Sequence, residues 1–349
     1  MKRDSPAVDL SPAIHAADLT KRYGDVLAVD HLDLDVRAGE FFGLLGPNGS
    51  GKTSTIHMLS TLIRPTGGTA RIAGHDVSNE GVKVRAAIGV VFQESALDRN
   101  LSAAENLRFA GLLYDLPRAE IKRRSDELLA LFGLTDKRDK PVASFSGGMR
   151  RALDIARGVI HRPRVLFLDE PTIGLDLPNR KKIWRFIENL RAETGMTVFL
   201  TTHYLEEAAD CDRVAFIKSG HIVQSGPPHE LVSRLGAFVI EIEADDADRI
   251  VAELAPRLGR AMMDGERACF RFHGDATQLA ALQTEFADRI GALRWRKPNL
   301  NDVFLWVNET EAAGRPSSGE MEGEHKAGRP CEDGISGAAN TTGFPPSRE

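Results

Sequence analysis

Apolar and polar residues alternate with a period of two over the early part of the chain, from Ile14 to Val36. The alternation is clearest in Val26–Val36. Successive side chains of a β-strand point to opposite faces, so this period predicts antiparallel strands. We expect them to lie beside a further strand at Phe41–Leu45, where five apolar or glycine residues follow one another.

Two other short apolar runs, Val165–Leu168 and Thr197–Leu200, are typical of parallel strands that are buried on both faces. A largely helical stretch runs from Ser102 to about Leu134 and is broken by Pro117. Strands that alternate with helices predict a layered α/β domain, which we place at residues 14–235.

A second pattern begins near Gly236 and predicts a small α+β accessory domain over residues 236–310. Its expected elements are a strand around Phe238, Ile240 and Ile242, a helix at Ala247–Leu258, a strand at Cys269–Phe272, a helix at Ala276–Ile290 and a short amphipathic helix at Asn301–Val307.

Both ends of the chain differ from these patterned regions. Residues 1–13 read as a flexible leader, and their lack of an apolar signal core predicts a protein that stays in the cytoplasm. Residues 311–349 are rich in Gly, Ser, Pro and Glu and contain few large apolar residues. Such a segment cannot bury enough surface to offset the entropy of ordering, so we expect a disordered tail.

The composition is that of a globular protein, with 42% hydrophobic and 27% charged residues among 349. No apolar run approaches the 18 residues or so that a membrane span needs. The net charge of −5 and the absence of a basic cluster do not favour a nucleic-acid partner. The three cysteines have no metal-ligand spacing, so we expect reduced, isolated thiols.

The sequence from Gly46 to Thr53 is a Gly-x-x-x-x-Gly-Lys-Thr phosphate-binding loop between a predicted strand and a predicted helix. Its backbone N–H groups and the helix N-terminus would hold phosphate oxygens. Lys52 would reach the β- and γ-phosphates, and the Thr53 hydroxyl would ligate Mg²⁺. The predicted nucleotide-binding residues here are Gly46, Pro47, Asn48, Gly49, Ser50, Gly51, Lys52, Thr53 and Ser54.

The apolar run Val165–Leu168 ends in two acids, Asp169 and Glu170. We expect this strand to lie beside the strand that precedes the phosphate loop. Asp169 would then hold Mg²⁺, and Glu170 could polarise the attacking water. Taken alone, the same pair is also typical of a helix N-cap with an acidic first turn.

A second glycine-containing helix start follows at Ser146, Gly147 and Gly148, where Ser146 is a plausible N-cap. Open N–H groups there would form another anion site, although a simple helix start would look similar. One γ-phosphate does not need two complete cradles from one domain. Two chains that face each other head to tail would use both, which predicts a dimer that closes on ATP.

With these motifs in this order, residues 14–230 resemble the ATP-binding subunits of ABC transporters. The resemblance implies that Tyr23 stacks on adenine, although a buried strand tyrosine is the alternative. It implies that Gln93 contacts Mg²⁺ and water and relays to a membrane partner. It further implies that Asp176 crosses the dimer seam and that His203 contacts the γ-phosphate. An ordinary loop glutamine is the alternative for Gln93, and a structural histidine is the alternative for His203.

Residues 95–102, 146–151 and 298–305 look like the daunorubicin-resistance and nodulation-factor exporter group. That resemblance implies an ATPase dimer, peripheral at the cytoplasmic face of the membrane, that drives a separate permease expelling drugs, lipids or polysaccharides. The chain departs from the family pattern at Phe145, Met149 and Leu177, none of which is a phosphate- or metal-contacting group.

Other functions remain open at this point. An importer ATPase would more often carry a β-rich regulatory barrel as its accessory domain. A soluble ABC ATPase of DNA repair or translation would usually carry two cassettes or a long coiled-coil insertion. A nucleotide kinase or GTPase would lack the Ser-Gly-Gly segment.

Overall fold

The computed structural model describes residues 12–243, 247–264, 267–286 and 292–309. The predicted tail lies outside these residues, as does the predicted leader apart from Pro12 and Ala13. Among the described residues, no helix combines the length and the apolar character needed to cross a membrane.

A six-stranded sheet in the order β10-β9-β3-β8-β7-β6 forms the centre of the molecule. Its neighbouring strands are parallel except for the edge pair β9 and β10. The strands are β3 (Phe41–Leu45), β6 (Ile88–Val91), β7 (Val165–Asp169), β8 (Thr197–Thr202), β9 (Arg213–Lys218) and β10 (His221–Gly226). The predicted parallel strands are therefore confirmed.

This sheet separates two hydrophobic cores, and alternate residues of each central strand enter opposite cores. In β3, Phe41 and Leu45 belong to the core on one face, and Phe42 and Leu44 belong to the other. Because both faces are covered, every residue of β3, β7 and β8 is buried. The continuous apolar runs of the sequence follow from this double burial.

The early strands form a separate antiparallel sheet in the order β2-β1-β4-β5. Its strands are β1 (Ile14–Tyr23), β2 (Val26–Val36), β4 (Gly67–Ile72) and β5 (His75–Asp76). The antiparallel prediction is confirmed, but β1 and β2 do not pair with β3. Their buried face packs on the second core together with α1 (Lys52–Leu59) and the buried Val84 of α2 (Gly81–Ala87).

The strand order also corrects the expected position of the acid-ended strand. β8 lies between β3 and β7, so the phosphate-loop strand and the acid-ended strand are not neighbours. A fully apolar strand fits any interior position of a parallel sheet equally well. The order of such strands in the sheet therefore cannot be predicted from the hydrophobic pattern.

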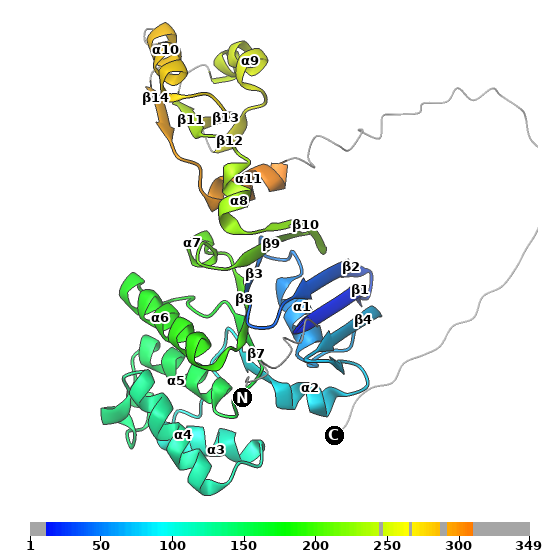
Figure 1. Ribbon diagram of the computed structural model, residues 1–349, viewed down its shortest axis with the longest axis vertical. Helices are drawn as coiled ribbons and strands as arrows, with labels where there is room; N and C mark the ends of the chain where they lie inside the picture. The colour runs from blue at the N-terminus through cyan, green and yellow to red at the C-terminus, as the bar shows by residue number, and fades with distance from the viewer. Residues whose placement is uncertain (1–11, 244–246, 265–266, 287–291, 310–349) are drawn as a thin grey trace, which may run out of the picture.

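Helices cover the other face of the central sheet (Figure 1). They are α3 (Ala103–Leu113), α4 (Arg118–Leu131), α5 (Gly147–Val159) and α6 (Leu177–Thr194), with single 3₁₀ turns at Thr135–Lys137 and Val142–Ser144. Ser102 and Glu105 form a reciprocal capping box at the start of α3. Pro117 directly precedes α4, as the predicted break requires.

The C-terminal part contains a third, antiparallel sheet in the order β12-β13-β11-β14. The elements are β11 (Phe238–Glu243), α9 (Ala247–Leu258), β12 (Met262–Asp264), β13 (Arg267–Phe272), α10 (Ala276–Phe286), β14 (Ala292–Arg296) and α11 (Leu300–Glu309). The predicted strands and helices are present, and residues 287–290 of the predicted second helix lie outside the described residues. The short strands β12 and β14 were not predicted.

Helix α11 joins this third sheet to the rest of the protein. It contacts α8 (Pro228–Ser233), α7 (Leu205–Ala208) and β9 as well as β12, and Figure 1 shows α8 and α11 between the third sheet and the central sheet. The guanidinium of Arg296 donates two hydrogen bonds of 2.7 Å to the fully buried carboxylate of Asp302. This bidentate pair fixes α11 against β14.

A half-buried histidine connects the helical layer to the central sheet. The His161 ring stacks on Tyr114, with ring centroids 3.6 Å apart, and its Nε2 lies 2.8 Å from the Ile88 carbonyl oxygen. We assign the proton to Nε2, because a carbonyl oxygen can only accept. Burial lowers the pKa of His161 from 6.5 to about 4.

The His161→Phe variant should flatten the acid dependence of stability. Because the folded pKa is depressed, the unfolded chain binds the extra proton first as pH falls below 6.5. Wild type therefore loses stability between pH 6.5 and 4, by at most about 3 kcal/mol. Urea unfolding at pH 7 and pH 4.5 measures this loss. The exposed His229→Gln control should behave as wild type, and equal losses in His161→Phe and wild type would contradict the assignment.

Candidate active site

The phosphate loop leaves the carboxyl end of β3 and enters α1. Gly51 adopts a φ of 109°, and a Cβ at this position would lie 2.5 Å from the Ala28 carbonyl oxygen. Only glycine fits such a left-handed, closely approached position. Pro47, Asn48 and Gly49 are exposed, so the outer rim of the loop is open to a ligand.

Lys52 is buried inside the loop that it terminates. Its Nζ donates hydrogen bonds to the carbonyl oxygens of Gly46 (2.8 Å) and Pro47 (3.0 Å). Burial lowers the pKa of Lys52, and the nearby carboxylates of Glu170 and Asp169 oppose that change. The structure therefore brings the loop lysine and both strand-end acids into one electrostatic cluster.

The strand register explains why residues that are far apart in sequence meet here. Leu45 pairs with Thr202, and the next residues along the two strands are Gly46 and His203. Similarly, Val91 pairs with Leu168, and Gln93 and Glu170 each follow by two residues. The carboxyl ends of four parallel strands thus deliver the loop, Gln93, Glu170 and His203 to one edge.

The two acids have different surroundings. Asp169 is buried and accepts a hydrogen bond from the Thr201 hydroxyl on β8. Glu170 adopts a left-handed φ of 46°, which is uncommon outside glycine, and its carboxylate oxygen lies 3.2 Å from His203 Nδ1. Strained backbone of this kind persists where surrounding contacts impose it. The alternative role for this pair, a helix N-cap, does not apply, because α6 is capped by Asp176.

Two other predicted residues lie at the surface. Gln93 is exposed just beyond β6. Tyr23 ends β1 with 46% of its surface exposed, and the Lys21 Nζ lies 5.0 Å from its ring centroid. The ring of Tyr23 is therefore open on one side and is not a buried strand tyrosine.

The Ser-Gly-Gly segment begins α5 and lies against α6. The Ser146 hydroxyl accepts a hydrogen bond from the Met149 N–H at 3.3 Å. A Cβ on Gly148 would lie 2.7 Å from the Asn179 Oδ1. Asp176 caps α6 by accepting a hydrogen bond of 2.9 Å from the Asn179 N–H. These residues share one surface at the starts of two helices.

Sequence analysis assigned no role to Arg151, yet its guanidinium connects three of the motifs. Its nitrogens donate to the carbonyl oxygens of Phe92, Pro171, Asp169 and Glu170, at distances of 2.5 to 3.3 Å. The side chain is buried, and burial lowers the pKa of Arg151. The sequence signal that could have indicated this role was an arginine on the buried face of α5, the helix that begins at the Ser-Gly-Gly segment.

The sequence motifs also indicated no role for Glu207. It is buried in α7 and accepts hydrogen bonds from the hydroxyls of Thr172, beyond Glu170, and of Thr202, which precedes His203. Burial raises the pKa of Glu207. Nearby, the Arg180 guanidinium lies 3.9 Å from the Tyr204 ring centroid and donates to the Leu175 carbonyl oxygen. These contacts tie the segment before Asp176 to the segment that carries His203.

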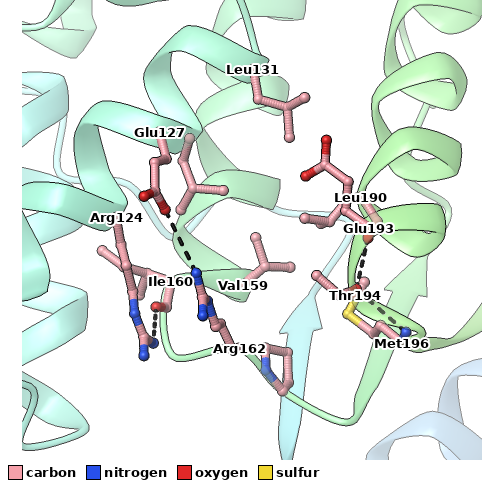
Figure 2. Close-up of a pocket in the computed structure, with 12 residues that line it drawn as sticks. Arg124, Glu127, Leu131, Val159, Ile160, Arg162, Leu190, Glu193, Thr194 and Met196 are labelled. Atoms are coloured by element: carbon pink, nitrogen blue, oxygen red, sulfur yellow. Dashed lines mark hydrogen bonds and ion pairs between the residues drawn. The ribbon is translucent and has the colours of Figure 1, made fainter.

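A separate cavity of about 350 Å³ lies between α4, α5 and α6 and is not part of this site (Figure 2). Its apolar walls include Leu131, Val159 and Leu190, and Glu127 pairs with Arg162 at 3.7 Å across its rim. Pro163 and Met196, which also line it, precede β7 and β8. The cavity is therefore at the amino end of the parallel strands, opposite the phosphate loop.

The chain is similar to several proteins of known family. Residues 29–173 match the family model described as ABC transporter. The Nod factor export ATP-binding protein I of Ralstonia nicotianae is 40% identical over 312 residues, which is 88% of this chain and 97% of that protein. The daunorubicin/doxorubicin resistance ATP-binding protein DrrA of Streptomyces peucetius is 47% identical over 67% of this chain and 71% of its own length.

A solved ATP-binding cassette, a dimer in a post-hydrolysis state bound to ADP and Pi, aligns with a TM-score of 0.56 and 27% identity. The alignment covers 61% of this chain and 98% of the cassette. These similarities agree with the geometry of the site, in which the phosphate loop, Glu170 and His203 lie at one edge of the central sheet. The chain belongs to the ABC transporter family and is an ATP-binding subunit with the fold and activity of an ABC ATPase.

Proposed function

We propose that this chain is the ATPase subunit of an exporter, which dimerises head to tail on ATP and powers a separate membrane permease. The names of its relatives, which concern Nod factor export and daunorubicin resistance, support export. The open third sheet, with helices on its faces, also differs from the β-rich barrel expected of an importer ATPase.

The observation that carries this proposal is the presence of two unlike half-sites on one chain. One half is the phosphate loop with Lys52, Glu170 and His203. The other is the α5 N-terminus at Ser146–Gly148, whose nearest neighbours lie in residues 175–179 and not in the loop. A head-to-tail dimer pairs each half-site with its complement, and Asp176 lies next to that seam. The similar cassette that is a dimer bound to ADP and Pi supports dimerisation.

ATP would stack its adenine on the exposed Tyr23 ring and place its phosphates in the loop from Gly46 to Ser54. The buried Ser50 hydroxyl oxygen has no hydrogen-bond partner among the described residues, so it is available to a phosphate. The Lys52 ammonium, which now donates to loop carbonyls, gains a stronger acceptor when phosphate enters.

The residues beside the loop fit a magnesium ion. Thr53, Gln93 and Asp169 offer a hydroxyl, an amide and a carboxylate, all of them hard oxygen donors of the kind that Mg²⁺ prefers, and phosphate oxygens would supply further ligands. The exposed position of Thr53 and Gln93 leaves both free to turn towards the phosphates. When bound, the ion would neutralise charge on the phosphates.

Glu170 would accept a hydrogen bond from the attacking water and orient it towards the γ-phosphorus. Lys52, Gln93 and His203 would stabilise the charge that spreads over the transferring phosphoryl oxygens. Arg151 acts here as a positioning residue, since it holds the carbonyl groups on both sides of Glu170 and the one before Gln93.

The surface beyond Gln93 would meet the permease. On α3, the side chains of Phe109, Leu112 and Leu113 are 55%, 45% and 62% exposed. Large apolar side chains grouped on a solvent-facing helix are typical of an interaction surface. We therefore place the relay to the membrane partner in residues 93–113.

Glu170→Gln should trap an ATP-bound dimer with little turnover. The amide keeps the shape of the carboxylate but accepts water protons poorly, so ATP stays bound at the closed seam. Sedimentation with and without ATP, together with phosphate release, measures both effects. Glu206→Gln, at an exposed acid of α7, is the matched control. A Glu170→Gln protein that stays monomeric and hydrolyses ATP normally would refute the proposal.

Arg151→Met should lower kcat about tenfold or more with little change in KM for ATP, because a loss of about 1.4 kcal/mol in positioning reduces the rate tenfold. The backbone carbonyls lose their common donor, but no phosphate contact is removed. The kcat of Arg151→Lys should lie between those of wild type and Arg151→Met. Arg185→Met, on the exposed face of α6, should match wild type. An increase in KM alone would mean that Arg151 supports binding and not the position of Glu170.

Leu113→Glu should weaken capture of the permease and leave basal ATPase activity unchanged. A charge in the apolar surface of α3 must be desolvated on docking. Co-purification from membranes with a co-expressed candidate permease measures the interaction. Leu62→Glu, at an equally exposed leucine elsewhere, is the control. Equal capture of both variants would exclude the α3 surface.

A further inference from the structure

The contact between the third sheet and the rest of the protein contains a positively charged cavity. Helix α11 forms its floor, and Trp306 on this helix packs against the apolar cores on both sides. The cavity has a volume of about 220 Å³. It is lined by Gln224 of β10, by α8, by the chain before β12 and by β13.

Three arginines from three segments point to this one cavity. Arg234 ends α8, Arg260 precedes β12 by two residues, and Arg271 lies in β13. Met262 pairs with Cys269, so Arg260, in the segment that leads into β12, and Arg271, on β13, each lie two residues beyond that pair. Arg271 shares its face of the sheet with Cys269 and lies 5.8 Å from the Trp306 ring centroid.

Among the described residues, no acidic side chain lines the cavity and none forms an ion pair with one of these arginines. Other arginines of the same region are neutralised: Arg296 pairs with Asp302 and Glu241, and Arg257 pairs with Glu285. Three like charges around one hollow repel one another, and that repulsion is relieved by an anion of more than one charge.

We propose that this cavity binds a phosphoryl anion, which links the ATPase part of the chain to the third sheet. Guanidinium groups match phosphate oxygens with paired N–H donors, and Gln224 offers a further amide donor. A volume of about 220 Å³ admits a diphosphate or the phosphate end of a larger molecule, but is small for a whole nucleotide. Leu231 and Val303 add apolar wall beside the charges.

The bound anion would connect α8 to β13 and to the chain before β12, in addition to the contacts through α11 and the hydrogen bond from the Ala237 N–H to the Phe272 carbonyl oxygen. Because it binds the folded arrangement alone, it should stabilise the protein by RT ln(1 + c/Kd), where c is the anion concentration, so that the effect grows with the logarithm of c above Kd. The site is independent of Lys52 and of the phosphate loop, so it can respond to a second phosphate source while ATP turns over.

Calorimetric titration with inorganic diphosphate tests the site in a Lys52→Ala background, which weakens competition from the phosphate loop. Adding Arg260→Gln and Arg271→Gln should raise the diphosphate Kd at least tenfold. Adding Arg257→Gln instead should leave it unchanged, since that arginine is paired outside the cavity. Arg234→Gln, on the exposed end of α8, gives an independent test should the double substitution impair folding.

A second arm separates a free anion from a lipid headgroup. Vesicles of phosphatidylcholine with phosphatidic acid, and vesicles of phosphatidylcholine alone, are sedimented with the same proteins. Arginine-dependent binding of diphosphate supports a free ligand, and arginine-dependent binding only to phosphatidic acid supports a headgroup. Binding that is insensitive to the three arginines, or the absence of binding in both arms, would overturn the proposal.

Discussion

Burial of both faces of the central sheet is the constraint on which the site depends. Apolar cores cover both faces of β3, β8, β7 and β6, as is usual for parallel strands, and the carboxyl ends of these strands meet along one edge. The phosphate loop follows β3, His203 follows β8, Glu170 follows β7 and Gln93 lies just beyond β6. Crevices at this edge are where open α/β sheets bind ligands, since polar loops there rest on a rigid apolar base.

The edge itself is held by polar groups in a low-dielectric environment. Arg151 satisfies carbonyl oxygens from two strand ends at once, and Glu207 accepts hydrogen bonds from the segments that follow Glu170 and precede His203. Buried groups of this kind stabilise one arrangement strongly, because any displacement leaves charges and carbonyls unpaired. The left-handed Glu170 backbone can persist only inside such a network.

Two other features of the chain lie apart from its phosphate loop. The Ser-Gly-Gly start of α5 lies beside the cap of α6, and α11 carries a positively charged cavity towards the third sheet. In the functions proposed above, the first would contact a phosphate held by a facing copy, and the second would bind a phosphoryl anion. Their shared feature is a set of N–H donors, from the backbone at the helix start and from guanidinium groups in the cavity, which match phosphate oxygens.

The sequence by itself determined the local elements and the phosphate-binding chemistry. The period of two in Val26–Val36, the apolar runs of β7 and β8 and the glycines of the loop are read from neighbouring residues, because strand faces and left-handed turns are local requirements. Only the tertiary structure decided that β8 separates β3 from β7, that β1 and β2 form their own sheet, and that β12 and β14 complete the third. It also decided that Arg151 contacts backbone carbonyl oxygens, whereas the three arginines Arg234, Arg260 and Arg271 line one cavity. These outcomes depend on contacts between distant segments, and an arginine reads the same in sequence whether it meets carbonyl oxygens or only other arginines.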